Sequence, residues 1–264
     1  MSDVGVVGIG NMGGAMARNL LKSGYSVVVC DVVKSAVDDL VDAGAAKAES
    51  PAELARSCDT IVVMVIDDKQ TTEVVAGQEG ILGGAQPGTV MLLCSSLQPK
   101  TVTSLASLAE AQGVSVLDGP VTGGEQGAID GKLTFLVGGD AETLERIRPV
   151  LAAMGEHIVS TGPLGTGQVV KNVHNVLLWT TLSATREALG FAAQFGLEPA
   201  AVRDSLQFTP AFNRWVRDWG NLGPAPWLRK DLETTLAVAS EAGIQMPFAA
   251  LSRELLKDWP GVRA

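Results

Sequence analysis

Residues 162–195 form one long stretch that carries almost no charge. Glycines occupy positions 162, 165 and 167, and more than twenty residues then follow without glycine or proline. The pattern predicts a helix over about residues 167–195, roughly 40 Å long at 1.5 Å per residue. Between Lys171 and Arg186 no residue is formally charged, and a helix that is apolar nearly all round must be buried, by other parts of the chain or by a second subunit.

Two polar side chains lie near the start of this predicted helix. Lys171 and Asn175 are four residues apart and therefore share one helix face. A cation buried beside an amide is costly unless it has a partner or a chemical use. We take this pair as the candidate chemical centre, and we interpret His174, one position off that face, as a packing or hydrogen-bonding residue.

A glycine-rich turn follows the first apolar run, residues 4–7, and precedes a helical pattern. In GIGNMG, residues 8–13, Gly8 permits the tight turn, Gly10 lets the backbone approach a pyrophosphate, and Gly13 allows close packing of helix and strand. The phosphates would lie at the N-terminus of the helix. The strand, turn and helix together predict a dinucleotide site, although the same glycines could form a turn that binds nothing.

An acidic residue follows the second predicted strand, residues 26–30. Asp31 lies 18 residues after Gly13, where a carboxylate can bind the ribose diol of an adenosine. Its charge would repel a 2′-phosphate, so the sequence favours NAD over NADP. Lys34 lies nearby and leaves NADP open as the less favoured cofactor.

Strand and helix patterns continue to alternate along the first 162 residues. Further strands are predicted at residues 60–65, 89–93, 115–117, 132–137 and 157–160, and helices at 99–111 and 141–152. Such alternation predicts an α/β fold with a parallel, doubly wound Rossmann-type sheet. Ligands bind at the carboxyl ends of the strands in this architecture, so Val65, Ile66, Ser95 and Ser96 are expected on the cofactor side. The two serines could equally be helix-capping residues.

A second glycine-rich turn follows Asp118. In DGPVTGGE, residues 118–125, the hydroxyl of Thr122 stands beside Gly123 and Gly124, just ahead of a predicted helix. Exposed backbone N–H groups in such a turn form a compact nest for an anion, and a substrate carboxylate would fit it. An ordinary strand-to-helix turn has the same composition and remains open.

The remaining chain shows only helical patterns, at residues 199–207, 213–219, 230–242 and 247–256. We therefore predict two domains: residues 1–162, which bind the cofactor, and residues 163–264, an all-α domain that the long helix joins to the first. The aromatic residues expected to be core or pocket wall in the second domain are Phe208, Phe212, Trp215 and Trp227.

Composition excludes several classes of function. The chain has 20 basic and 29 acidic residues, a net charge of −9, which argues against non-specific binding to nucleic acid or to an anionic membrane.

Cys30, Cys58 and Cys94 show no metal-binding spacing, so we expect no metal site and interpret them as buried thiols in a reducing cytoplasm. The N-terminus has no pattern of a signal peptide, and no segment is apolar enough to be expected to span a membrane.

Four motifs resemble those of the β-hydroxyacid dehydrogenases, the 3-hydroxyisobutyrate dehydrogenase family, over about residues 4–255. They are GIGNMGGAMARNL, DGPVTGGEQGAIDGKLTFLVGG, GTGQVVKNVHN and KDLETTLAVA. The resemblance implies reversible oxidation of a small 3-hydroxy acid to its semialdehyde or keto acid with NAD(P). It also implies dimers or tetramers formed through the long helix and the helical domain.

The same resemblance implies roles for individual residues. Lys171 would be the catalytic acid/base, and Asn175 would orient the substrate. The substrate carboxylate would bind to Thr122, Gly123 and Gly124, and Lys230 would reach the site from the helical domain or simply be a solvated lysine at a helix start. The residues that match cofactor positions are Asn11, Met12, Asp31, Val65 and Ser96.

The proposed chemistry agrees with what the residues allow. Hydride transfer from a carbinol carbon needs one base for the hydroxyl proton, and a lysine can serve if desolvation or a nearby positive charge lowers its pKa. Two alternatives remain: a semialdehyde reductase of the tartronate type or an imine reductase, and a non-catalytic dinucleotide-binding scaffold. Imine reductases resemble this family but usually lack the lysine, and a scaffold would be expected to have lost it. The chain departs from the family in having Thr122 for the usual serine and Cys94 for a common acid, and in a shortened helical region.

Overall fold

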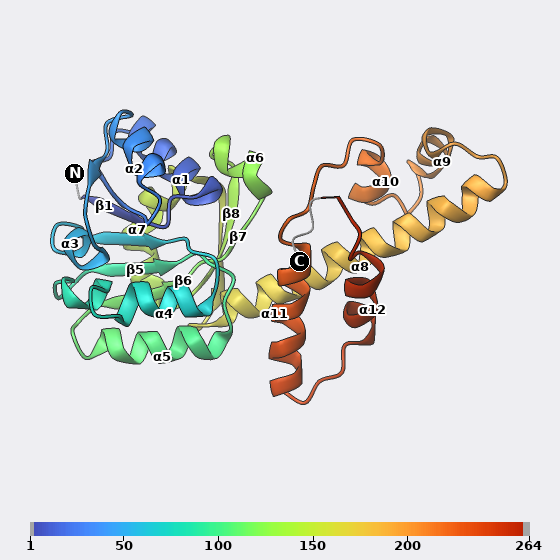
Figure 1. Cartoon of the computed structure of the whole chain (residues 1–264). Helices are drawn as coiled ribbons and strands as arrows, with labels where there is room; N and C mark the ends of the chain where they lie inside the picture. Colours follow the sequence, from blue (N-terminus) through green and yellow to red (C-terminus); the bar gives the residue numbers. More distant parts are fainter. Residues whose placement is uncertain (1–2, 261–264) are drawn as a thin grey trace. The chain divides into compact units, whose positions relative to one another are not determined.

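The structure is a computed structural model and describes residues 3–260. Its contacts divide the chain into two compact units, residues 1–171 and 172–264, whereas the domain boundary predicted from sequence lies after residue 162, where the last strand ends. Figure 1 shows the sheet and its helices in the first unit and helices in the second.

Within the described residues, nine strands of unit 1 form one sheet in the order β3-β2-β1-β4-β5-β6-β8-β7, and β9 pairs with β8. The strands are β1 (Val4–Val7), β2 (Val27–Cys30), β3 (Ala46–Lys47), β4 (Thr60–Val63), β5 (Val90–Leu93), β6 (Ser115–Asp118), β7 (Val121–Thr122), β8 (Leu133–Gly138) and β9 (Gly155–Gly162). The helices of unit 1 are α1 (Asn11–Lys22), α2 (Lys34–Val41), α3 (Pro51–Ala55), α4 (Asp68–Ala76), the 3₁₀ helix η1 (Ile81–Gly83), α5 (Pro99–Glu110), α6 (Gly124–Ile129) and α7 (Ala141–Ala152).

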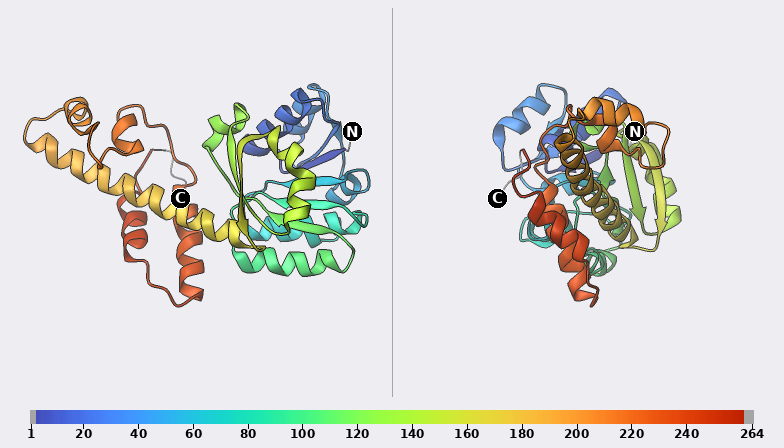
Figure 2. Two further views of the ribbon diagram at one scale, coloured as in Figure 1. Left: turned by 180° about the vertical axis from the view of Figure 1, so that it is seen from behind. Right: turned by 90° about the vertical axis from the view of Figure 1, so that its right-hand side faces the viewer.

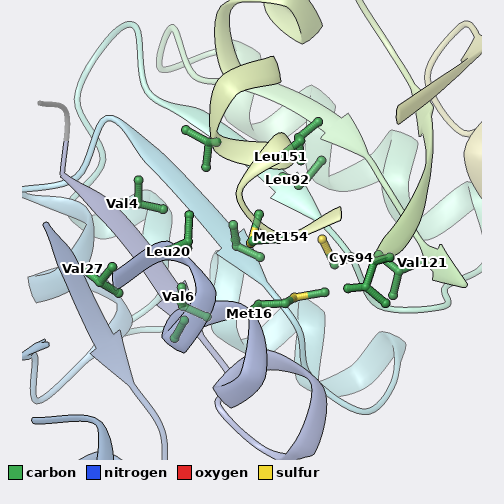
Figure 3. Close-up of a cluster of buried hydrophobic side chains, with 14 of the residues drawn as sticks. Val4, Val6, Met16, Leu20, Val27, Leu92, Cys94, Val121, Leu151 and Met154 are labelled. Atoms are coloured by element: carbon green, nitrogen blue, oxygen red, sulfur yellow. The ribbon is translucent and has the colours of Figure 1, made fainter. Parts of the chain in front are cut away.

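Helices cover both faces of this sheet, which confirms the doubly wound α/β prediction. Strand side chains alternate between the faces, so Val90 and Leu92 of β5 pack in one core cluster while Met91 and Leu93 pack in the other. The first cluster includes side chains of α1, α2 and α7, and Figure 3 shows Met16 and Leu20 of α1 against the sheet. The second cluster receives side chains of α3, α4 and α5.

The predicted parallel sheet has an exception at β8 and β9, which run opposite to the other strands. Strands β1 to β6 are parallel, but β8 pairs antiparallel with both β6 and β7. A parallel connection needs a crossover of a dozen or more residues, usually a helix. The connection from β7 to β8, residues 123–132, has only ten residues and contains the six-residue helix α6, which is too short for such a return, so β8 runs back against β7 and β6. The connection from β8 to β9 contains the twelve-residue α7, and those two strands are parallel.

The long helix is confirmed as α8 (Thr166–Gln194), uninterrupted over 29 residues (Figure 2). It begins in unit 1, and unit 2 contains its remainder with α9 (Pro199–Leu206), α10 (Arg214–Asp218), α11 (Leu228–Glu241) and α12 (Pro247–Leu255). Only part of its apolar surface is buried within the chain: Leu182 is fully buried, but Leu177 is 62 % exposed. The exposed face has no covering element among the described residues.

The aromatic residues of unit 2 divide between core and surface. Trp215 is buried and stacks on Trp179 with ring centroids 5.8 Å apart, whereas Phe208 is 90 % exposed and is not part of the core. A position in a short loop after α9 leaves Phe208 without neighbours to pack on, which explains why the expectation from hydrophobicity is wrong there.

Candidate functional site

The glycine-rich turn between β1 and α1 has the geometry that a bound pyrophosphate requires. Gly8 has a φ of +85°, and a Cβ on Gly13 would lie only 1.9 Å from the carbonyl oxygen of Gly8, so a side chain at either position would be strained or would clash. A Cβ on Gly10 would meet no atom within 4 Å. Gly10 is the N-cap of α1 and provides no side-chain cap, so the turn leaves open space before the first N–H groups of a helix. This cradle fits a dinucleotide.

Asp31 lies directly at this turn. Its Oδ2 accepts a hydrogen bond from the backbone N–H of Ile9 (2.7 Å), and its Oδ1 accepts one from Val33 N–H (2.9 Å). Parallel pairing of β1 with β2 brings the carboxylate beside the glycines, because the two strands end at the same edge of the sheet. The next residue, Val32, is 97 % exposed and carries no charge.

The ends of β4 and β5 form the neighbouring part of the same edge. Ser95 Oγ accepts a hydrogen bond from Val65 N–H (3.0 Å) and donates one to Val65 O (2.8 Å). The N-cap of α5 is Gln98, and the hydroxyl of Ser95 bonds to Val65, so the helix-cap alternative is wrong for Ser95. Ser95 is therefore a link between two loops, and Ile66 lies beyond it with its side chain 62 % exposed.

The second glycine-rich turn connects β7 to α6. Gly123 and Gly124 both have positive φ values, +123° and +67°, and Thr122 immediately precedes them. Asn11 at the start of α1 donates from Nδ2 to Oε2 of Glu125 (3.1 Å). The first turns of α1 and α6 are therefore in contact, and the two glycine-rich turns predicted from sequence are brought together in unit 1. Met12, which follows Asn11, is partly buried against the core.

The start of α8 is fixed to this edge by a residue that the sequence analysis did not identify as functional. Asp118 is fully buried, and its carboxylate accepts hydrogen bonds from the N–H groups of Gly165 (2.6 Å) and Gln168 (2.8 Å). It caps α8 from a separate strand. A Cβ on Gly167 would lie 2.6 Å from Oδ2 of Asp118, so the glycines before Lys171 make room for this carboxylate. In the sequence, Asp118 stands at the end of a predicted strand and glycines stand at 162, 165 and 167. These two features together could have identified the capping role of Asp118.

Burial raises the pKa of Asp118 above its ordinary value of 3.8, and the backbone N–H groups oppose that shift only in part. The folded protein therefore binds this proton more tightly than the unfolded chain does. The stability that Asp118 contributes is fully present below pH 3.8 and is lost as the pH rises through the folded-state pKa. Wild type should lose stability relative to Asp118→Asn as the pH rises through that window.

Urea unfolding of wild type, Asp118→Asn and the exposed-site control Asp38→Asn between pH 4 and pH 7 measures this effect. We expect the difference in unfolding free energy between wild type and Asp118→Asn to change more with pH than the difference between wild type and Asp38→Asn. A pH-independent difference for Asp118→Asn would contradict a raised pKa at this carboxyl.

Lys171 is three residues after Gln168 and is half-buried, and it belongs to the same unit as the glycine-rich turns. Asn175 is one turn further along α8 and is buried, and its Oδ1 has no hydrogen-bond partner within residues 3–260. A buried oxygen without a donor costs free energy unless a ligand supplies one. The buried amide is therefore suited to binding a hydroxyl or ammonium group.

In unit 2, α8 and α11 are joined by a buried polar network. Trp179 Nε1 donates to Oδ2 of Asp231 (3.1 Å), and Thr235 Oγ1 donates to Oδ1 of Asn172 (2.7 Å). Lys230 precedes Asp231 in the first turn of α11 and is half-buried. Its two interpretations, a ligand-binding lysine and a lysine at a helix start, both stay predictions.

The three cysteine thiols and the other possible metal-binding side chains do not form a second catalytic or metal site within residues 3–260. Cys30, Cys58 and Cys94 are free and buried, and burial raises the pKa of the first two thiols to about 11. Thiols with such pKa values are poor nucleophiles at neutral pH. Across residues 3–260 there is no group of three or more His, Cys, Asp or Glu side chains able to hold a metal ion. Nor is any described helix both long and apolar enough to cross a membrane.

Comparison with known proteins adds two family matches. Residues 3–162 match the NAD binding domain of 6-phosphogluconate dehydrogenase, and residues 165–260 match the NAD-binding region of NADP-dependent 3-hydroxyisobutyrate dehydrogenase. Similar curated proteins of Pseudomonas aeruginosa are an NAD-dependent L-serine dehydrogenase, 34 % identical over 97 % of this chain and 92 % of that protein, and a 3-hydroxyisobutyrate dehydrogenase, 35 % identical over 97 % and 91 %. A solved structure of Mycobacterium tuberculosis 3-hydroxyisobutyrate dehydrogenase with L-serine is similar with a TM-score of 0.91 and 27 % identity, over 99 % of this chain and 96 % of that one.

Proposed function

We propose a reaction for this protein from one premise: the chain belongs to the 3-hydroxyisobutyrate dehydrogenase family of β-hydroxyacid dehydrogenases. It is an NAD(P)-dependent hydroxy acid dehydrogenase. The reaction that we propose interconverts a small 3-hydroxy acid and its semialdehyde or keto acid, with Lys171 as the acid/base. The observation that carries the proposal is that α8 begins at the carboxyl edge of the sheet, where Asp118 fixes its first turn in the unit that also holds both glycine-rich turns.

Different residues of the chain bind the substrate, transfer the proton and orient the substrate in this reaction. Bound NAD(P) supplies the hydride acceptor or donor. Thr122 Oγ1 and the N–H groups of Gly123 and Gly124 bind the substrate carboxylate, because a glycine-rich turn just ahead of a helix exposes backbone N–H groups to an anion. In oxidation, neutral Lys171 takes the hydroxyl proton at Nζ; in reduction, its ammonium returns that proton to the developing alkoxide. Asn175 orients the substrate, which its buried and unpartnered Oδ1 supports.

The cofactor would be bound by the turn between β1 and α1. Gly8, Gly10 and Gly13 shape the cradle, Asn11 and Met12 follow at the start of α1, and Asp31 binds the ribose hydroxyls. Val65, Ile66 and Ser96 lie on the loops after β4 and β5. Lys230 is retained as a candidate contact to substrate or cofactor.

An assay of NAD⁺ and NADP⁺ reduction across a panel of hydroxy acids tests the function. The panel contains 3-hydroxyisobutyrate, glycerate, serine, 3-hydroxypropionate and bulkier analogues, with the matching semialdehydes and imines assayed in the reductive direction. Serine belongs in it because one relative is named an L-serine dehydrogenase and one similar structure contains L-serine. Oxidation of at least one 3-hydroxy acid is expected. Turnover of imines alone, or tight dinucleotide binding without turnover, would contradict the proposal and favour one of the two alternatives.

Preference for NAD over NADP is a further part of the proposal. Asp31 is held at the turn by two backbone N–H groups, and the exposed Val32 offers no cation to a 2′-phosphate. We expect the Asp31→Ser/Val32→Arg double variant to raise kcat/KM for NADP⁺ by about tenfold or more, since a charge-assisted hydrogen bond contributes about 1.5–3 kcal/mol. Steady-state kinetics with both cofactors measure the change. Wild type that already favours NADP⁺ would contradict this preference.

Association through the exposed face of α8 is proposed from its apolar residues. Val173, Leu177 and Phe191 are 54 %, 62 % and 67 % exposed, and contiguous apolar patches on a soluble protein mark interaction sites. We expect wild type to be a dimer or tetramer and Leu177→Glu/Phe191→Glu to be a monomer by light scattering. The control is Leu108→Glu, an exposed leucine on α5 of unit 1. Monomeric wild type at micromolar concentration would refute the association.

A cytoplasmic location also stays a proposal. Its support is that Cys30, Cys58 and Cys94 are free thiols, as is usual in a reducing compartment. Cell fractionation tests it, and recovery of the protein from an oxidising compartment would contradict it.

A further inference from the structure

The buried amide of Gln168 connects the first turn of α8 to the loop after β5 through two hydrogen bonds. Gln168 Nε2 donates to Ser95 O (2.9 Å), and Gln168 Oε1 accepts from Leu97 N–H (2.9 Å). The side chain is 1 % exposed, so both polar atoms must be paired, and both are. One amide thus binds a carbonyl and an N–H that lie two residues apart in a single loop.

The same loop leads to the cofactor edge of the sheet. Ser95, whose carbonyl accepts from Gln168, bonds through its hydroxyl to both the N–H and the carbonyl of Val65. A continuous series of hydrogen bonds therefore runs from the end of β4 to the first turn of α8. Lys171 follows Gln168 by three residues, so the two lie on neighbouring positions of one helix face.

Asp118 and Gln168 constrain different motions of this turn. The carboxylate of Asp118 binds the backbone N–H groups of Gly165 and Gln168, which fixes where the helix begins. The side chain of Gln168 instead binds two backbone groups of the loop after β5, Leu97 N–H and Ser95 O, and these two bonds oppose rotation of the first turn about the helix axis. Rotation of α8 would swing the Lys171 side chain along the edge of the sheet.

We propose that Gln168 is a positioning residue that sets the orientation of Lys171 for proton transfer. The inference rests on the proposed function, in which Lys171 Nζ exchanges a proton with the substrate oxygen. Misplacement of a reacting group by about 1 Å can cost roughly 10²-fold in rate. A buried apolar side chain of the same length could fill this space, but it could not form the two hydrogen bonds that restrict rotation of α8. The amide of Gln168 therefore does more than pack.

The principal test is Gln168→Met, which keeps the length of the side chain and removes both hydrogen bonds. We expect kcat to fall by about 10–100-fold while KM for NAD⁺ stays within about threefold. The primary deuterium isotope effect on kcat should rise or stay high, because the chemical step becomes slower than product release. A kcat within twofold of wild type would overturn the proposal, and so would a parallel rise in KM for NAD⁺, which would assign Gln168 to cofactor binding.

The matched control is Gln86→Met. Gln86 also donates from its amide to a backbone carbonyl, that of Gly84 (2.9 Å), but it precedes β5 at the opposite edge of the sheet. The same substitution there should leave kcat unchanged. An equal loss of kcat in both variants would mean that the effect is general destabilisation, and the positioning role would be wrong.

Hydrogen–deuterium exchange provides a readout that does not depend on turnover. In Gln168→Met, peptides that cover residues 94–98 and 165–171 should exchange faster than in wild type, because Leu97 N–H loses its acceptor and the helix turn loses its side anchor. Lys171→Met should leave both peptides unchanged. If wild type oxidises no hydroxy acid, the proposed function fails, while unchanged exchange in Gln168→Met would separately overturn the anchoring role.

Gln168→Glu keeps the proposal testable if the methionine variant does not fold. A carboxylate of the same shape can still accept from Leu97 N–H, but when ionised it cannot donate to Ser95 O. Its kcat should lie below that of wild type by about tenfold, with KM for NAD⁺ unchanged. Wild-type kcat and wild-type exchange in Gln168→Glu would overturn the proposal.

Discussion

Lys171→Met is expected to lower kcat for hydroxy acid oxidation by about 10²–10⁴-fold, the usual contribution of general acid–base catalysis. Methionine keeps most of the length of the apolar stem and removes the amine. The backbone contacts that anchor α8 involve Asp118, Gly165 and Gln168, and the substitution alters none of them. The glycine-rich turn and Asp31 are likewise untouched, so the affinity for NAD⁺ should stay within about threefold of wild type.

Stopped-flow and steady-state kinetics measure the loss of turnover, and fluorescence titration with NADH measures cofactor affinity. The control is Lys22→Met, which removes an exposed lysine from the last turn of α1. If Lys171→Met retains near-normal kcat, another group transfers the proton and the assignment of Lys171 is wrong. A loss of NADH binding together with activity would instead indicate a structural role for this lysine.

Gly10→Ala and Gly13→Ala are expected to separate cofactor binding from folding. A Cβ on Gly10 meets nothing within 4 Å, and the φ of −63° at this residue suits alanine, so the free energy of unfolding should change by less than about 1 kcal/mol. The methyl group would occupy the space where the backbone must approach a pyrophosphate. Loss of one or two charge-assisted hydrogen bonds should weaken NAD⁺ binding by about 10–100-fold.

Gly13→Ala should lower both the affinity for NAD⁺ and the stability of the fold. Its Cβ would lie 1.9 Å from Gly8 O, and backbone on both sides leaves little room to relax, so we expect about 1–3 kcal/mol of destabilisation as well as lost binding. Chemical denaturation and calorimetric titration with NAD⁺ measure the two effects. The control, Gly190→Ala, lies in α8 with open space around its Cβ and should raise stability without affecting affinity. Unchanged NAD⁺ affinity in Gly10→Ala would contradict the assignment of this turn to the pyrophosphate.

The sequence alone determined the parts of this protein that depend on near neighbours in the chain. The glycine spacing in residues 8–13 and Asp31 after the second strand are local patterns, and the structure has them where predicted, at the connection of β1 to α1 and directly after β2. The long helix was predicted at about residues 167–195 and observed at Thr166–Gln194, because helix formation is governed by contacts between residues three and four apart. The candidate site residues Lys171 and Asn175 are likewise predicted from their spacing of four residues on that helix.

Only the tertiary structure decided how distant segments meet. The reversal of β8 follows from the shortness of the connection before it, which a strand pattern does not reveal. Ser95 bonds to Val65 across 30 residues, and Asp118 reaches Gly165 across 47, so their partners cannot be read from local periodicity. The sequence also did not predict which side of α8 is exposed, because hydrophobicity indicates that a helix face needs burial but not which element covers it. Composition and spacing thus specify the elements, while long-range hydrogen bonds and packing specify where α8 begins and what its first turn is bonded to.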